Sequence, residues 1–131
     1  MTLVLDASAL VEFVLGSGKG RQVLALVNIS GADLHAPELI VAESLSALRS
    51  LERRSEIAPG PATEAAADLR SVSLVGYPTR TLADRIWALR GRFTMYDAHY
   101  VALADVLGAP LITGDRRLAN AAKDLIPVHI V

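Results

Sequence analysis

Four acidic residues, far apart in the sequence, have the chemistry and the placement needed to hold a divalent metal ion. They are Asp6, Glu43, Asp97 and Asp115. Asp6 directly follows the first short apolar run of the chain, and Asp115 follows another such run by two residues. Carboxylate oxygens are the ligands that Mg²⁺ and Mn²⁺ prefer, and proteins commonly use these ions to act on phosphates. The four acids therefore predict a site for Mg²⁺, or for Mn²⁺ in its place, suited to phosphate chemistry.

Carboxylates gathered at one place require a cation. Two like charges about 4 Å apart repel by roughly 4 kcal/mol at an effective dielectric constant of 20. Without a cation, some of the acids should be protonated or turned apart. Zinc is disfavoured as the cation, because the chain has no cysteine and only three scattered histidines. We expect His35, His99 and His129 to be structural or surface residues.

Each aspartate also has a purely structural explanation. Aspartate is a preferred residue at the start of a helix, so Asp6 and Asp115 can simply cap the helices that follow them. Thr94 and Asp97 have the spacing of a capping box. Taken singly, each acid fits the structural explanation as well as the functional one, and only the set of four favours a metal site.

Glu43 is the more informative acid, because the stretch from Leu39 to Ser46 contains no other charge. It lies about 200° around the predicted helix from Val41, away from an apolar stripe that we expect to be buried. The stripe consists of Val41, Leu45 and Leu48. The side of the helix that carries Glu43 has small, partly apolar neighbours, which suits either close packing or a recessed site.

Hydroxyl and guanidinium groups accompany the acids. Ser8 and Thr113 each lie two residues from an aspartate and can hydrogen-bond a carboxylate or a metal-bound water, although Ser8 equally suits a helix cap. Four arginines are candidate phosphate contacts, and for any one of them a solvated surface position is the simpler explanation. They are Arg80, Arg85, Arg116 and Arg117.

Short apolar strands that alternate with helices must position these residues. The predicted strands are Leu3–Leu5, Asp33–Ala36, Val72–Val75, Leu111–Thr113 and Val128–Val131. The predicted helices are Ser8–Leu15, Arg21–Ile29, Pro37–Arg54, Ala62–Arg70, Thr81–Arg90, Asp97–Leu107 and Arg116–Lys123. This alternation predicts an α/β fold with a parallel sheet covered on both faces, whose carboxyl edge would gather all four acids.

The segment from Asp97 to Asp115 supports that juxtaposition by its length alone. Ten residues of helix advance roughly 15 Å, and five residues of strand running back advance roughly 16 Å. Asp115 should therefore return to the level of Asp97. Asp97 also precedes Tyr100 and Val101 by three and four residues, which places its carboxylate on the apolar side of the helix.

Composition sets the outer limits of the interpretation. A chain of 131 residues is most simply one domain, over residues 1–131, and it can bury a core without a metal or disulfide. The absence of cysteine fits a reducing, cytoplasmic location, and neither a signal peptide nor a membrane-spanning run is evident. Although the net charge is only −1, arginine supplies 11 of the 13 basic residues, which is compatible with an acidic pit ringed by arginine.

The motifs around the four acids resemble those of PIN-domain ribonucleases, and most closely the VapC-type toxins of bacterial toxin–antitoxin pairs. They are LVLDASAL, APELIVAESLSAL, TMYDAHYVALA and LITGDRRLANAA, in this order. The segment from Ser55 to Thr79 is similar only in its helical character. The resemblance implies a three-layer α/β/α sandwich with a short, mostly parallel sheet of four to five strands.

The same resemblance implies a function and roles for residues. It implies Mg²⁺- or Mn²⁺-dependent endonucleolytic cleavage of RNA, a homodimer and inhibition by an antitoxin protein. Asp6 and Asp97 would be direct metal ligands, with Glu43 and Asp115 completing an acidic pocket and one of those two holding the attacking water. Ser8 and Thr113 match the family's small hydroxyl residues beside its first and last acids.

Two other classes of function stay open. A haloacid-type phosphatase needs a second aspartate two residues after the first, where this chain has Ser8, and a phosphoryl-accepting receiver needs a lysine after a late strand, where none is found. A non-catalytic binding module would use the acids only as helix caps. Binding of Mn²⁺, and its loss when Asp6 is changed, separates that module from the metal-dependent nuclease.

Overall fold

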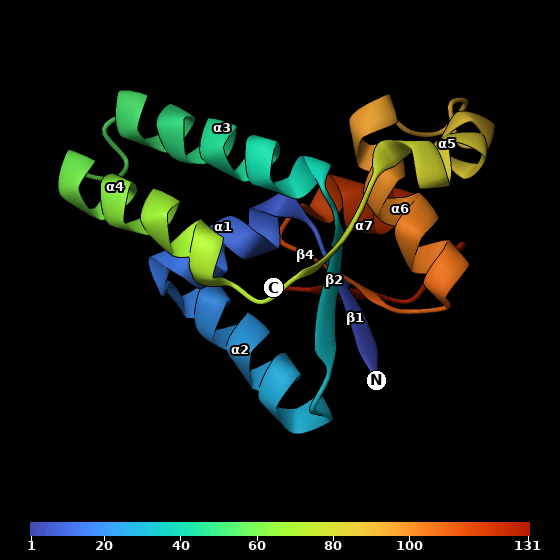
Figure 1. The fold of residues 1–131 in the computed structure, drawn as a ribbon, viewed down its shortest axis with the longest axis horizontal. Coiled ribbons are helices and arrows are strands. Elements are labelled where there is room, and N and C mark those ends of the chain that lie inside the picture. The colour runs from blue at the N-terminus through green and yellow to red at the C-terminus, as the bar shows by residue number, and fades with distance from the viewer.

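A five-stranded sheet forms the centre of the molecule in a computed structural model that describes all 131 residues (Figure 1). Its strands are β1 (Thr2–Leu5), β2 (Asp33–Pro37), β3 (Val75–Tyr77), β4 (Leu111–Thr113) and β5 (Val128–Ile130). They lie in the order β3-β2-β1-β4-β5, and every neighbouring pair is parallel. The predicted α/β/α sandwich is confirmed, and the sheet is parallel throughout.

Helices cover both faces of this sheet. They are α1 (Ala7–Leu15), α2 (Gly18–Ser30), α3 (Leu39–Arg53), α4 (Pro59–Asp68), α5 (Thr79–Ala88), α6 (Met95–Leu107) and α7 (Arg116–Ala122), with a short 3₁₀ turn at Leu69–Ser71. Helices α1 to α4 pack together on one side, while α5 and α6 lie on the other (Figure 1). No helix of the structure is long and apolar enough to span a membrane.

The centre of the sheet places the first and last acidic segments next to each other. The β1 residues Leu3–Leu5 are buried, and Leu5 pairs with Ile112 of β4. The backbone N–H of Asp6 then donates to the carbonyl of Ile112 at 3.1 Å, so the pairing continues one residue beyond β1. Because both strands run in the same direction, the residues that follow them emerge side by side at the carboxyl edge.

Two predicted boundaries on the β3 side of the sheet are wrong. The third strand is Val75–Tyr77, not Val72–Val75, because a 3₁₀ turn follows α4 and Val75 lies at an exposed sheet edge, where an apolar run is a weak signal. Pro37 ends β2 instead of starting a helix. The N–H of Glu38 donates to the carbonyl of Tyr77 at 2.9 Å, which extends the strand pairing past Pro37.

The buried stripe predicted for α3 is also wrong. Val41 and Leu45 are 46% and 45% exposed, whereas Ile40, Ser44 and Leu48 are buried. The helix packs against α1 and α4 through this second set of residues. Two apolar stripes run along α3, and only the packing of its neighbours selects the one that is covered.

Candidate active site

Asp6 is the most firmly held acid of the structure. Its side chain is 4% exposed. Its Oδ1 accepts hydrogen bonds from the Ser8 hydroxyl at 2.7 Å and from the Ala9 N–H at 2.9 Å, and its Oδ2 accepts one from the Thr113 hydroxyl. Asp6 therefore caps α1, as its structural explanation requires. It is also fixed by Ser8, which the sequence placed beside it, and by Thr113, which the sequence placed beside Asp115.

This network joins the ends of β1 and β4. The Ser8 hydroxyl accepts from the Gly114 N–H at 2.9 Å, and the Thr113 hydroxyl accepts from the Asp115 N–H at 2.9 Å. Burial raises the pKa of Asp6, and the negative charge of Asp115 adds to this rise, while the hydrogen bonds from Thr113, Ser8 and Ala9 oppose it. Asp6 thus lies in a site that disfavours its charge unless a cation is added.

Asp97 and Asp115 meet across a single guanidinium group. The Nη2 of Arg117 lies 3.6 Å from Oδ2 of Asp97 and 3.8 Å from Oδ2 of Asp115. Burial raises the pKa of Asp97, with a further contribution from Asp115, and the charge of Arg117 acts in the opposite direction. The predicted return of Asp115 to the level of Asp97 is therefore confirmed by the structure.

Both of these acids belong to helix starts. Asp115 caps α7 by accepting from the N–H groups of Arg117 and Leu118 at 2.9 and 3.2 Å. Thr94 caps α6 by accepting from the Asp97 N–H at 3.1 Å. The Asp97 carboxylate stays half-buried beside Arg117, with its side chain 26% exposed. A structural role for the turn thus coexists with a carboxylate directed into the site.

Glu43 is held by a residue that the sequence placed only in the core. The hydroxyl of Tyr100 donates to Oε1 of Glu43 at 2.6 Å. Tyr100 is 2% exposed, and burial together with Glu43 raises its pKa, so its hydroxyl keeps its proton and stays a donor. The signal for this role was present in the sequence, because Tyr100 follows Asp97 by three residues and so shares its side of the helix.

The set of donors fits a hard divalent cation, although the side chains do not converge on one point. All four acids lie at the carboxyl edge and offer only oxygen ligands, and the charge of Asp115 raises the pKa of both Asp6 and Asp97. No three acidic or histidine side chains stand close enough to hold a metal ion in their present rotamers. Tyr100 holds Glu43, and Arg117 separates Asp97 from Asp115, so binding would require these side chains to turn.

The histidines have no part in this edge. His99 is buried, with its ring nitrogens 3.0 Å from the Thr79 hydroxyl and 2.6 Å from the Met95 carbonyl. His35 contacts the Tyr77 hydroxyl at 2.7 Å.

Residues 3–124 of the chain match the family model described as the PIN domain.

This chain belongs to the PIN-domain family, in the VapC ribonuclease group. The chain is 35% identical to ribonuclease VapC9 of Mycobacterium tuberculosis over 129 residues, which cover 98% of each protein. Family membership confirms the resemblance predicted from the four acidic motifs, and with it the assignment of this PIN domain to the nuclease enzymes.

Solved structures agree with the fold of the PIN domain. The crystal structure of PAE2754 from Pyrobaculum aerophilum superposes with a TM-score of 0.71 at 23% identity, covering 97% of this chain and 83% of that one. That of Mycobacterium tuberculosis VapC20, described as a sarcin-ricin loop cleaving toxin, gives a TM-score of 0.65 at 17% identity, covering 91% and 94%. At these identities the likeness concerns the fold alone.

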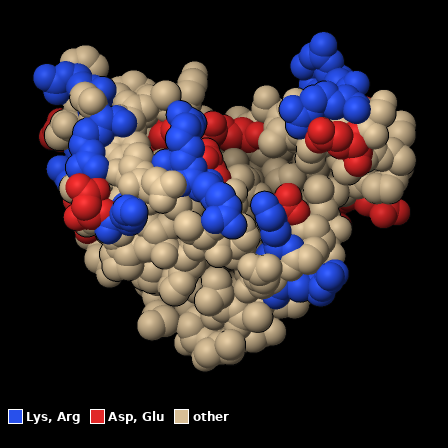
Figure 2. All heavy atoms as spheres, turned by 180° about the vertical axis from the view of Figure 1, so that it is seen from behind, with Lys and Arg blue, Asp and Glu red and all other residues tan.

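The predicted arginine contacts divide into one that reaches the acids and three that do not. Arg117 touches Asp97 and Asp115, whereas Arg85 pairs with Asp105 at 2.7 Å. Arg80 and Arg116 are exposed and make no ion pair. From behind, acidic atoms lie in a notch between two raised lobes that carry basic atoms (Figure 2).

Arg92 is a further basic residue at this edge that the sequence did not single out. A hollow of about 160 Å³ lies beside the acids and is lined by Arg92, Thr94, Asp97 and Arg117, among others. Arg92 is positioned there by Asp124, at 2.7 Å, and by the carbonyl of Ala121. Only the tertiary structure brings α7 and the loop before α6 together around this hollow.

Proposed function

We propose that this PIN domain is a Mg²⁺- or Mn²⁺-dependent endoribonuclease that acts as the toxin of a type II toxin–antitoxin pair. The observation that carries the proposal is the buried, triply hydrogen-bonded Asp6 carboxylate near Asp115, which in turn meets Asp97 across Arg117 at the carboxyl edge of the sheet. Membership among the VapC ribonucleases supports RNA as the substrate. The reaction is hydrolysis of a phosphodiester bond.

Asp6 and Asp97 would hold the cation, with Glu43 and Asp115 completing the pocket. A bound divalent cation would supply positive charge that offsets the charge developing on the phosphate and would acidify a water for in-line attack. The raised pKa values of Asp6 and Asp97 support this assignment, because burial and the charge of Asp115 disfavour both carboxylates and a bound cation would offset both effects.

The other side chains of the site position these acids. Ser8 and Thr113 fix both oxygens of Asp6, so that the carboxylate presents one orientation. Tyr100 holds one oxygen of Glu43 and leaves the other free to accept a proton from an attacking water. Arg117 is placed to leave the acids and contact a phosphate when the cation replaces its charge.

The proposal includes partners that follow from the VapC group. We propose a cognate antitoxin protein that inhibits the enzyme, and a homodimer as its working form. The cytoplasmic location, the single domain over residues 1–131 and the roles of the four acids stay predictions. The test for a partner is co-expression with a short reading frame encoded directly upstream, followed by purification of the complex.

The activity is tested by incubating the protein with total RNA in Mg²⁺, and again with excess chelator, and mapping the ends of the fragments. We expect cuts in Mg²⁺ and none with chelator. Asp97→Asn should abolish cutting, whereas Asp105→Asn is a matched control on the same helix, outside the acidic edge. Cleavage that survives both chelator and Asp97→Asn would refute the metal-dependent mechanism.

Calorimetry separates this enzyme from a non-catalytic module whose acids only cap helices. We expect Mn²⁺ to bind to the wild-type protein, and we expect the binding to weaken strongly in Asp97→Asn. The same measurement on Asp105→Asn should give the wild-type result. An absence of Mn²⁺ binding in the wild type would favour the binding module.

A further inference from the structure

A cleft of about 510 Å³ opens between α3 and the start of α6, directly beside the acidic edge. Its walls are one face of α3 and the side chain of Tyr96. The α3 face is made of residues spaced three or four apart, among them Glu43, Ser46 and Ser50. Glu43 thus belongs both to the cleft and to the acidic edge, and whatever occupies the cleft lies next to a phosphate held by the acids.

Tyr96 is an aromatic side chain with no partner in the chain. It is 63% exposed, and it makes neither a hydrogen bond nor an aromatic contact. Tyr100, four residues later on the same side of α6, is buried and holds Glu43. One side of α6 therefore carries a tyrosine that fixes an acid and, one turn earlier, a tyrosine whose ring is open to a ligand.

The floor of the cleft is formed by small side chains, both apolar and hydroxyl-bearing. Ala42, Ser46, Ala47 and Ser50 are all small, which leaves room above α3. The hydroxyls of Ser46 and Ser50 have no hydrogen-bond partner in the chain, and each can both donate and accept. An aromatic wall with free hydroxyls below it matches a flat heterocycle that has polar edges.

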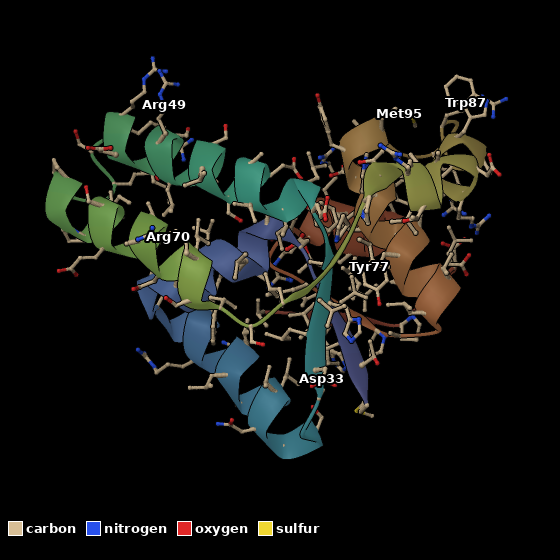
Figure 3. All side chains as sticks on the ribbon, in the orientation of Figure 1. Asp33, Arg49, Arg70, Tyr77, Trp87 and Met95 are labelled. Carbon is tan, nitrogen blue, oxygen red and sulfur yellow. The ribbon has the colours of Figure 1, made fainter.

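Basic side chains lie beside this face of α3, at the end of the cleft that is farther from the acids. Arg49 follows Ala42 by seven residues and Arg53 follows Ser46 by seven, so each lies only about 20° around the helix from a cleft residue. Both are exposed and neither makes an ion pair. Arg49 projects from near the C-terminal end of α3, on the same side of the molecule as Met95 at the start of α6 (Figure 3). Along α3, the acidic edge therefore comes first, then the cleft with Tyr96, and then the arginines.

We propose that this cleft binds one nucleobase of a single-stranded RNA, the base next to the scissile phosphate, stacked on the ring of Tyr96. The inference rests on the proposed ribonuclease function and adds the form of its substrate. A base can reach the ring only when it is unstacked, as in a loop or a single strand. Arg49 and Arg53 would contact phosphates of the following nucleotides. Stacking accepts every base, so Tyr96 determines strandedness and position, and not sequence.

The test is RNA binding in an Asp6→Asn background, which leaves the RNA uncut in Mg²⁺ while asparagine keeps the cap of α1. A fluorescent single-stranded octamer is titrated with this protein and with the same protein carrying Tyr96→Ala. A series of octamers that each lack one base then locates the stacked position. We expect Tyr96→Ala to weaken binding of the intact octamer about tenfold or more, from the usual strength of base stacking on an aromatic ring.

The deciding result is that the effect of Tyr96→Ala on RNA affinity disappears when one particular base of the octamer is missing. On the octamer that lacks the stacked base, Tyr96→Ala should change the affinity by less than about twofold, whereas on the other octamers the full effect should persist. Tyr96→Phe keeps the ring and should behave like tyrosine. Trp87→Ala removes another exposed aromatic, on α5 and outside the cleft (Figure 3), and should have no effect.

Other outcomes overturn the inference. An equal effect of Tyr96→Ala on all octamers, or none on any, shows that no base stacks on Tyr96. A change of oligomeric mass in Tyr96→Ala, seen by light scattering without base coupling, shows that the cleft is a protein interface. If the wild type neither binds nor cuts RNA, the proposed function fails as well; if it cuts RNA and only the coupling is missing, the base site alone fails.

Discussion

The two sides of the acidic edge are built in opposite ways. On the side of β1 and β4, Asp6 is buried and receives three hydrogen bonds, two from side chains and one from the backbone. On the side of α3 and α6, Glu43 receives a single hydrogen bond from Tyr100, and Asp97 has only a loose contact with the exposed Arg117. Asp6 is fixed before any ligand arrives, whereas Glu43 and Asp97 can still turn.

The difference follows from the elements that supply the acids. Asp6 directly follows the central strand β1, and the backbone pairing of β1 with β4 continues through the N–H of Asp6, so its backbone position is fixed. Glu43 and Asp97 come from helices that only approach each other at their ends. A carboxylate that is already fixed can set the geometry of a bound cation, while carboxylates that can turn complete its coordination shell and let the cation leave. The five predictions below test this contrast.

The largest expected effect is the loss of Asp6. Asp6→Asn should lower RNA cleavage about a thousandfold or more, because losing a metal ligand removes several kcal/mol of transition-state stabilisation. Initial rates on a labelled RNA measure the effect, and circular dichroism checks that the asparagine variant keeps its helices. A rate within tenfold of the wild type would mean that Asp6 is only a cap.

Thr113→Val tests whether the hydrogen bonds to Asp6 matter. Valine has nearly the same shape but cannot donate to Oδ2, so the carboxylate loses one of its anchors and its pKa should rise further. We expect Mn²⁺ affinity, measured by calorimetry, to fall about 10- to 100-fold. Thr81→Val, at an exposed hydroxyl on α5, is the matched control. Equal Mn²⁺ affinities in Thr113→Val and Thr81→Val would show that the hydrogen bond from Thr113 does not fix Asp6 for metal binding.

Tyr100→Phe makes the corresponding change on the adjustable side. It removes only the hydroxyl that donates to Glu43. A hydrogen bond to a charged group contributes about 1.5–3 kcal/mol, and Glu43 can recover part of this by finding a new position. We therefore expect cleavage to fall only roughly tenfold, and less than it falls in Thr113→Val. A larger loss than that of Thr113→Val would show that Glu43 is as tightly positioned as Asp6.

The stability of the metal-free protein should depend on pH through Asp6 and Asp97. Burial raises the pKa of both above the unfolded values, so the folded state binds protons more tightly and loses this stability as pH rises through the raised pKa values. Asp6→Asn should therefore melt a few degrees above the wild type at pH 8, and the difference should shrink towards pH 4. Calorimetric melting curves measure it, and saturating Mg²⁺ should remove it.

The smallest effect is expected for Arg117→Gln. Arg117 is 78% exposed and contacts Asp97 and Asp115 at 3.6 and 3.8 Å, so its charge is largely screened by solvent. Removing it should tighten Mn²⁺ binding about two- to fivefold, because the cation no longer competes with the guanidinium. Arg116→Gln, at the neighbouring exposed arginine, is the control. Weaker Mn²⁺ binding in Arg117→Gln alone would indicate that Arg117 helps to assemble the site.

The alternation of apolar strands and helices was enough to predict the parallel sheet and the edge at which Asp6 and Asp115 emerge. It was enough because strand direction forces these residues to one side. The lengths of α6 and β4 likewise predicted the meeting of Asp97 with Asp115, since both lengths are fixed by backbone geometry. Local rules also gave the caps at Asp6, Thr94 and Asp115.

Only the tertiary structure decided which side chains hold the acids and which faces remain open. Tyr100 was a core residue by pattern and became the donor to Glu43 because α6 packs where α3 begins. Val41 and Leu45 had the spacing of a buried stripe, yet the neighbours of α3 cover its other stripe. Tyr96 faces the cleft for the same reason. Periodicity in a sequence defines the faces of a helix, but the choice of the covered face depends on elements distant along the chain.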